Sequence, residues 1–220
     1  MLKIRYYKLR LPQESGVESL ASSAYKLGTE NGISVLEFTS SNLVLKCTFT
    51  KQIETTQILS DGTEVRTQIP TMEQFSVRFF QASAGLMLSL LDPPRGSRVT
   101  TEVLSKLLGE EEYFIEPLEI DTKMIRRHIL SFDSARLVSA KIRDFKVYDN
   151  AIGRLEISSK DGLAEEIAPF LAGKYHKVDS LTYEVTHQFR RGLICYANNG
   201  TVRVSGPLVE TAFPTFEQQF

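Results

Sequence analysis

The stretch LTYEVTHQFRRGLICYANNGTVRVSG, residues 181–206, decides the fold that we expect. Apolar and polar residues alternate from Leu181 to Arg190, as they do on a β-strand with one buried face. Asn199-Gly200 lies between two apolar runs and is a strong hairpin signal, because a type I′ turn needs positive φ at both central residues. The stretch therefore predicts three antiparallel strands joined by two tight turns.

The second turn sets the outer face of this three-stranded sheet. A two-residue turn at Asn199-Gly200 pairs Tyr196 with Arg203 and places both side chains on the outer face. Arginine binds phosphate, and an exposed tyrosine can stack on a base. Together with Arg190-Arg191 at the first turn, they are the best candidates for contact with nucleic acid, and a solvated loop is the alternative.

The first turn decides what the inner face holds. A two-residue and a three-residue loop both fit residues 190–192, and the three-residue loop collects more apolar side chains on one face. That register pairs His187 with Cys195 on the core side and puts Gly192 in the left-handed position of a bulge. A catalytic thiolate needs a nearby base and access to substrate, so a sealed His187–Cys195 pair indicates a packed core rather than a dyad.

The composition is that of an ordinary globular protein. The 220 residues are 42% hydrophobic and 24% charged, with a formal net charge of −1, so that only a local patch could attract nucleic acid. No apolar run reaches the length of about 18 residues that a membrane span needs, and the N-terminus lacks the apolar core of a secretory signal. Cys47 and Cys195 fall at inward strand positions, which favours a cytoplasmic protein without disulfides.

The sequence carries none of the common motifs of catalysis or cofactor binding. It has no Walker A loop, no GxGxxG, no GxSxG elbow and no HExxH, and its histidines and cysteines are not clustered as zinc ligands. Residues 110–121 hold six acidic residues, but they lack the order of a calcium loop and favour a solvated linker. We therefore expect no cofactor and no metal, and lean towards a protein that is not an enzyme.

Residues 52–70, QIETTQILSDGTEVRTQIP, contain a second hairpin signal at Asp61-Gly62. A two-residue loop there pairs Ile58 with Val65, and neither face is strongly apolar. Because an isolated two-stranded hairpin is marginal in water, we expect an arm that projects from the sheet and is stabilised by its root or by a partner. The alternative is an edge hairpin that lies flat on the domain. The candidate partner-binding residues of this hairpin are Thr56, Ile58, Val65 and Arg66.

Two helices carry further candidate residues. Asp121 is a helix cap, and the helix after it has His128 on its inner stripe with Arg126 and Arg127 beside it. We add Arg126 and Arg127 to the candidate nucleic-acid contacts and favour a half-buried core position for His128. A last helix begins near Pro207, and its apolar side chains would be costly in water, so we expect it docked on this chain or on a neighbour. Its candidate partner-binding residues are Phe213, Phe216 and Phe220.

The order of the expected elements predicts an α+β fold. We expect a large, mostly antiparallel, twisted sheet covered by about five helices, with two similar β-α-β(n)-α halves as one option. Residues 1–109 would form the N-terminal half with the hairpin 52–70, residues 110–121 an acidic connector, and residues 122–220 the C-terminal half. Two local details are a helix from Ser159 to Ala172 and a bulge near Arg143-Asp144, where the apolar parity of a long strand changes. The element order resembles TATA-binding-protein-like and helix-grip folds, and this resemblance implies no activity.

Protein–protein contact is the function that we favour from the sequence. The chain would be a non-catalytic cytoplasmic subunit whose hairpin and C-terminal tail bind a protein partner or a second copy. The alternative is a nucleic-acid-binding or nucleic-acid-processing protein that uses the arginines above. A second alternative is a small-molecule site between the sheet and its helices.

Overall fold

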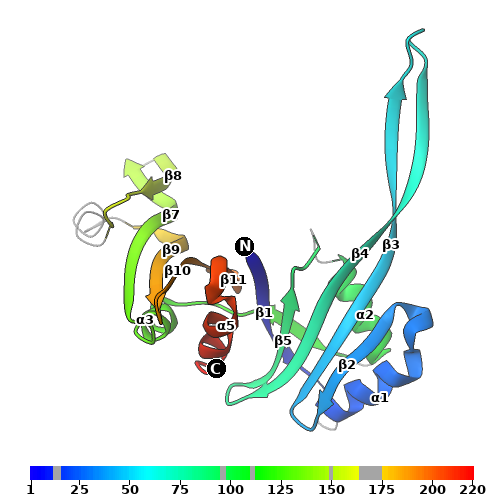
Figure 1. The fold of residues 1–220 in the computed structure, drawn as a ribbon, viewed down its shortest axis with the longest axis horizontal. Helices are drawn as coiled ribbons and strands as arrows, with labels where there is room; N and C mark the ends of the chain where they lie inside the picture. The colour runs from blue at the N-terminus through cyan, green and yellow to red at the C-terminus, as the bar shows by residue number, and fades with distance from the viewer. Residues whose placement is uncertain (12–15, 95–97, 110–111, 149–150, 164–174) are drawn as a thin grey trace. The chain divides into compact units, whose positions relative to one another are not determined.

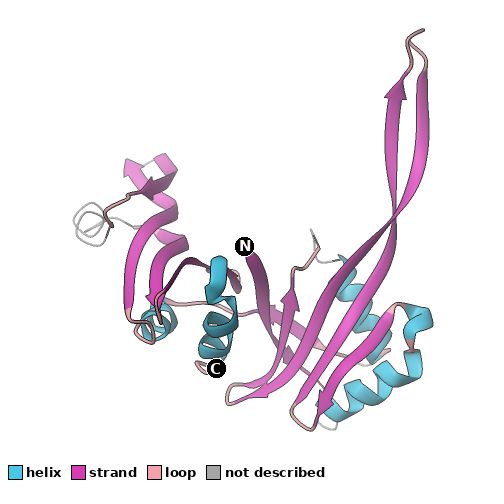
Figure 2. Ribbon diagram, in the orientation of Figure 1, coloured by secondary structure: helices cyan, strands magenta, loops and turns pink. Residues whose placement is uncertain are grey.

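The computed structural model describes residues 1–11, 16–94, 98–109, 112–148, 151–163 and 175–220. Within them the chain forms eleven β-strands, four α-helices and two short 3-10 helices, and Figure 2 shows how far strands predominate. The expected sheet covered by about five helices is wrong, because strands make up 55% and helices 22% of a sheet-rich, mostly antiparallel fold. Two long hairpin strands account for part of the excess, and residues 159–163 are not helical. The rest of the helix expected up to Ala172 lies outside the described residues.

The chain divides into two compact units, which we call the arm unit and the C-terminal unit. The arm unit comprises Leu9–Gln81 and Leu86–Phe114, and the C-terminal unit comprises Met1–Lys8, Ala82–Gly85 and Ile115–Phe220. The division between Phe114 and Ile115 falls inside the acidic stretch 110–121. Part of that stretch is folded, since strand β6 (Phe114–Pro117) pairs with β1, and Leu118 and Ile120 are buried.

The arm unit is built on four strands in the order β2-β3-β4-β5. Their bounds are Ile33–Thr39, Asn42–Ile58, Glu64–Ala82 and Gly85–Leu91. On the inner face, Leu45 of β3 lies opposite Val77 of β4, and both are buried. Two helices, α1 (Val17–Leu27) and α2 (Arg98–Leu108), bury apolar side chains that recur at helical spacing, among them Leu20 in the first and Leu104 in the second.

The C-terminal unit contains a second run of strands in the order β1-β11-β10-β9-β7-β8. Their bounds, in chain order, are Leu2–Arg10 for β1, Ser134–Tyr148 for β7, Ala151–Ser158 for β8, Lys177–His187 for β9, Arg190–Ala197 for β10 and Thr201–Val204 for β11. The predicted three-stranded meander is confirmed as β9, β10 and β11, with antiparallel pairing throughout. Its inner face packs against helices α3 (Thr122–Ile129) and α5 (Val209–Glu217), the second of which follows a 3-10 turn at Gly206–Leu208.

The register expected for the first meander turn is wrong. The loop consists of Gln188 and Phe189, so Arg190 pairs with His187 and Gly192 lies within β10 opposite Val185. Both loop residues have positive φ, 50° and 64°, a conformation that residues other than glycine seldom adopt. Asp133, far away in sequence, accepts a 2.8 Å hydrogen bond from the Gln188 backbone N–H and helps to hold this turn.

The register of the second meander turn differs from the expected one by a single residue. The loop has three residues, Asn198 to Gly200, so Ala197 pairs with Thr201 and Tyr196 with Val202. Because side chains alternate along a strand, this shift moves Tyr196 from the outer face to the core. Gly200 has a φ of +81°, and a Cβ there would lie 2.4 Å from the Tyr6 carbonyl oxygen, so this corner of the loop needs glycine.

The bulge predicted near Arg143-Asp144 is confirmed. The pairing of β7 with β8 shifts between Ile142 and Phe145, and Asp144 has a φ of 54°. As a result both Ile142 and Phe145 are buried, although they lie on opposite parities of the sequence.

Candidate functional site

The outer part of the β3–β4 hairpin, residues 50–72, projects from the arm unit as a two-stranded ribbon (Figure 1). We call it the arm. Every residue of the arm except Thr71 is exposed, on both faces of the ribbon. Ten residues of β3 and the following loop, 50–59, span roughly 30 Å at about 3.3 Å per residue. The prediction of a projecting arm is therefore confirmed, and the alternative of a hairpin that lies flat on the domain is wrong.

The arm keeps the register of the sheet from which it grows. All seventeen β3–β4 pairs, from Asn42 opposite Phe80 to Ile58 opposite Glu64, follow one another without a shift. The tip is a longer loop than expected, in which the Gly62 N–H donates to the Leu59 carbonyl at 2.9 Å. The predicted pairing of Ile58 with Val65 is therefore wrong, and these two side chains lie on opposite faces of the ribbon.

Both faces of the arm carry large exposed apolar side chains. On the face that continues the core face of the sheet, Ile53 and Ile69 are a cross-strand pair, 43% and 46% exposed. On the other face Ile58 and Met72 are 70% and 68% exposed. The candidate partner-binding residues Thr56, Ile58, Val65 and Arg66 are all exposed, as a contact surface requires.

The net charge of the arm and the unpaired backbone edge of β3 indicate which kinds of partner the arm can bind. The arm holds two basic side chains and three acidic ones, so it is slightly negative and disfavours phosphate. Arg66 lies 3.6 Å from Glu54 on the same face, which offsets its charge further. Beyond Thr48, the edge of β3 away from β4 pairs with no strand in the part of the chain that is described, and such an edge can accept a strand from a partner.

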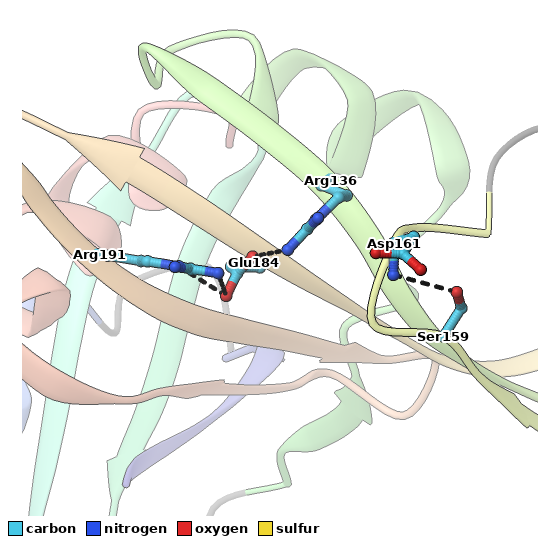
Figure 3. A network of polar contacts seen from close by, with 5 residues as sticks. All are labelled: Arg136, Ser159, Asp161, Glu184 and Arg191. Atoms are coloured by element: carbon cyan, nitrogen blue, oxygen red, sulfur yellow. Dashed lines mark hydrogen bonds and ion pairs between the residues drawn. The ribbon is translucent and has the colours of Figure 1, made fainter.

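A second polar cluster lies on the C-terminal unit, on the sheet face opposite α3 and α5 (Figure 3). Glu184 of β9 sits between Arg136 of β7 and Arg191 of β10, with Arg191 Nε 2.7 Å from its carboxylate and Arg136 bonded to the other oxygen. The hydrogen bond from Arg136, followed by that from Arg191, lowers the pKa of Glu184 below its usual value. Arg191, a candidate phosphate contact, is therefore engaged in an ion-pair network that joins three strands.

Sequence reasoning missed Arg136 and Glu184. Both belong to polar positions of alternating strands, and nothing local indicates that β7 and β9 are neighbours. Alternation along each strand indicates a polar face. Which residues of that face contact one another can be known only from the order of the strands in the sheet.

The remaining candidate nucleic-acid contacts do not share one surface. Tyr196 is 1% exposed and hydrogen-bonds His128, so the prediction of an exposed stacking tyrosine is wrong. Arg203 is exposed on the face opposite Tyr196, whereas Arg126 and Arg127 are exposed on α3, which packs on the Tyr196 side. Arg190 is also exposed, at the first meander turn, with Glu210 at 3.6 Å.

Two of the C-terminal phenylalanines, Phe213 and Phe216, are core residues rather than parts of an exposed partner-binding tail. Phe213 and Phe216 are 6% and 0% exposed, and the Phe220 ring lies 5.3 Å from Tyr6 and 5.2 Å from Phe216. The expected docking of the last helix is therefore found, and it takes place within the C-terminal unit. The interpretation of Phe213 and Phe216 as partner-binding residues is wrong, because both are buried.

The predicted pairing of His187 with Cys195 is wrong. Cys195 pairs with Thr182, whereas His187 pairs with Arg190 at the end of β9, so the two side chains lie on opposite faces of the sheet. The His187 ring packs edge-on against Phe132 at 5.7 Å, and its Nδ1 lies 3.6 Å from Asp133. These two residues therefore cannot act together as nucleophile and base.

Comparison of the sequence with protein-family models and with curated proteins found no match. In the described part of the chain, no group of three histidine, cysteine, aspartate or glutamate residues could hold a metal ion. None of the helices described is long and apolar enough to cross a membrane.

Proposed function

We propose that this chain is a non-catalytic subunit that binds a protein partner through the arm, residues 50–72. The observation that carries the proposal is a ribbon with large apolar side chains exposed on both faces, Ile53 and Ile69 on one and Ile58 on the other. Full burial of one such side chain contributes about 1.5–3 kcal/mol, so a partner that covers either face gains several kcal/mol. A two-stranded ribbon is marginal in water, which gives a covering partner a second advantage.

The chemistry of the arm favours protein over nucleic acid as that partner. Its slightly negative charge opposes phosphate, and Arg66 is offset by Glu54. The open edge of β3 offers backbone N–H and C=O groups to an added strand, while the isoleucines provide the side-chain contacts. A second copy of this chain and a different subunit both supply such a strand, and the experiment below separates them.

Truncation of the arm tests the proposal. Because Thr50 pairs directly with Met72, residues 51–71 can be replaced by Asn-Gly so that the hairpin closes in register. We expect native mass spectrometry of protein purified from its source to show a defined complex for the full chain. The truncated chain should be monomeric, with an unchanged melting temperature for the remaining sheet. The masses in the full-length complex distinguish a homo-oligomer from a heteromer.

Point variants test whether the effect of the truncation comes from the apolar side chains of the arm rather than from the shorter chain. Ile53→Lys and Ile69→Lys should each weaken assembly at least tenfold, because each places a charge in the covered face. Leu130→Lys, at a residue 74% exposed on the C-terminal unit, is the matched control and should leave assembly intact. A full-length chain that stays monomeric and carries no partner, or a truncated chain that assembles as well as the full one, would refute the proposal.

Nucleic-acid binding is the second candidate. It is supported by the exposure of Arg126, Arg127 and Arg203, whose guanidinium groups have no ion-pair partner among the residues described. Their distribution over two sides of the sheet makes a shared phosphate surface difficult to form. A filter-binding assay at low salt should show retention of RNA or DNA that falls steeply as salt rises, and no retention would remove this candidate.

A further inference from the structure

Helix α3 and the inner face of the C-terminal sheet leave a pocket of about 740 Å³ between them. Its apolar walls come from α3, β7, β9 and the turn that precedes residue 164. They include Ile125, Ile129, Ala135, Leu137, Leu163 and Leu181. Thr122, Arg126, Arg136, Asp161 and Tyr183 add polar or charged side chains to this lining. A pocket of this size that combines apolar walls with polar groups is typical of small-molecule sites.

Two polar side chains among the lining residues have no partner in the described part of the chain. Arg126 of α3 is one of the lining residues, and no hydrogen bond or ion pair joins its guanidinium to any other described side chain. Tyr183 of β9 is another lining residue, and its hydroxyl likewise has no hydrogen-bond partner within the described ranges. Its ring lies 6.2 Å from that of Tyr196. Burial raises the pKa of Tyr183, so this hydroxyl stays protonated at neutral pH and can donate.

The charges around the pocket favour a single negative charge on a ligand. Arg126, Arg136 and Asp161 are its charged lining residues. The Arg136 side chain is bonded to Glu184 on the other face of the sheet, so among the described lining residues Arg126 is the cation left to pair with an anion. A dianion such as a phosphate monoester would face Asp161 without a second free cation.

We propose that this pocket binds a small amphipathic carboxylate. The apolar body of the ligand lies between Ile125 and Leu137, and its carboxylate accepts hydrogen bonds from Arg126 and Tyr183. This site is independent of the arm, so the failure of either proposal leaves the other standing.

Decanoate is a suitable probe, because its alkyl chain is flexible and its head group is a monoanion. Isothermal titration of the full-length protein with decanoate below its micellar concentration should show saturable binding with a stoichiometry of one. Decyltrimethylammonium, with the same chain and the opposite charge, should bind at least tenfold more weakly. In methyl NMR spectra, the signals of Ile125 and Ile129 should shift on addition of decanoate.

Two neighbouring arginines of α3 supply a matched pair of variants. Arg126→Gln should weaken decanoate binding by about tenfold or more, because it removes a charge-assisted hydrogen bond. Arg127→Gln changes the net charge equally on the same helix but does not line the pocket, and should leave binding unchanged. Tyr183→Phe should weaken binding several-fold without loss of the fold.

Three results would overturn the proposal. The first is the absence of saturable decanoate binding to the wild-type chain. The second is an equal effect of Arg126→Gln and Arg127→Gln, which would indicate a general electrostatic attraction. The third is equal binding of the cationic probe, which would indicate nonspecific association with apolar surface.

Discussion

His128 of helix α3 and Tyr196 of strand β10 are joined by a 2.6 Å hydrogen bond in the core of the C-terminal unit. On the other side of the ring, His128 Nε2 lies 2.9 Å from Thr215 Oγ1. The Thr215 hydroxyl donates to the Thr211 carbonyl at 2.8 Å, so its oxygen accepts from Nε2–H and the Tyr196 hydroxyl donates to Nδ1. The neutral imidazole is therefore fully satisfied, and a second ring proton would confront the Tyr196 donor.

Acid should destabilise the C-terminal unit through His128. Burial lowers its pKa from 6.5 to about 4. Because the folded pKa is below the unfolded one, the stabilisation is fully present above pH 6.5 and is lost as the pH falls from 6.5 through 4. The expected loss is about 3 kcal/mol. Urea unfolding at a series of pH values measures it, with His128→Gln as the reference that lacks this term. Parallel pH profiles for the two proteins would contradict the prediction.

Removal of the Tyr196 hydroxyl should cost more than removal of the neighbouring Tyr183 hydroxyl. Tyr196→Phe leaves the buried Nδ1 of His128 without a donor, at a cost of about 1–3 kcal/mol. In Tyr183→Phe the lost hydroxyl has no partner among the described groups, so a change within about 0.5 kcal/mol is expected. Chemical denaturation of both variants at pH 7.5 gives the comparison, and equal losses would show that the hydrogen bond contributes nothing.

Two loop glycines with similar φ should respond differently to alanine. At Gly200 the new Cβ would meet the Tyr6 carbonyl oxygen at 2.4 Å, so we expect a loss of roughly 2 kcal/mol or more. At Gly62, in the arm loop, a Cβ meets nothing within 4 Å, and the conformational cost of about 1 kcal/mol stays local. Thermal unfolding followed by circular dichroism should show a lowered transition for Gly200→Ala alone.

The two cysteines should differ in reactivity in the native state. Cys47 is completely buried in the arm unit, and burial raises its pKa to about 12, so it presents neither access nor thiolate to a reagent. Cys195 is partly exposed on the C-terminal unit. Brief iodoacetamide treatment followed by peptide mass spectrometry should show alkylation of Cys195 and protection of Cys47 until denaturant is added. Equal labelling in native buffer would contradict this.

Alternation and capping predicted much of the fold from local sequence. The meander strands, the arm and the Asp121 cap, whose carboxylate accepts from the Met124 N–H at 2.7 Å, are all found. These features depend on residues close together in the chain. The same holds for the β7 bulge at Asp144, where the apolar parity changes within one strand.

Strand register could not be obtained in this way. The first meander turn uses Gln188 and Phe189 at positive φ, against their local preference, and a hydrogen bond from the distant Asp133 helps to hold it. Local sequence favours Gly192 as the turn residue with positive φ, but in the structure its lack of a side chain serves a different purpose. A Cβ at Gly192 would lie 2.6 Å from the Ser205 carbonyl oxygen, so the position is fixed by packing of β10 against the segment that follows β11.

The errors at the candidate site follow from those registers. A shift of one residue placed Tyr196 among exposed groups, when it belongs with His128 in the core. The C-terminal phenylalanines were assigned to a partner because a helical pattern alone does not show which surface covers it. Only the strand order identified Glu184 as the link between Arg136 and Arg191.

The unbroken β3–β4 ladder gives the arm a mechanical property. Between the pair Leu45–Val77 in the core and the pair Ile58–Glu64 near the tip there is no slip in the pairing and hence no hinge. A force applied to the tip is therefore transmitted from each β3–β4 residue pair to the next, down to the root of the arm. Under our proposal, a partner bound at the tip would therefore also orient the sheet at the root of the arm.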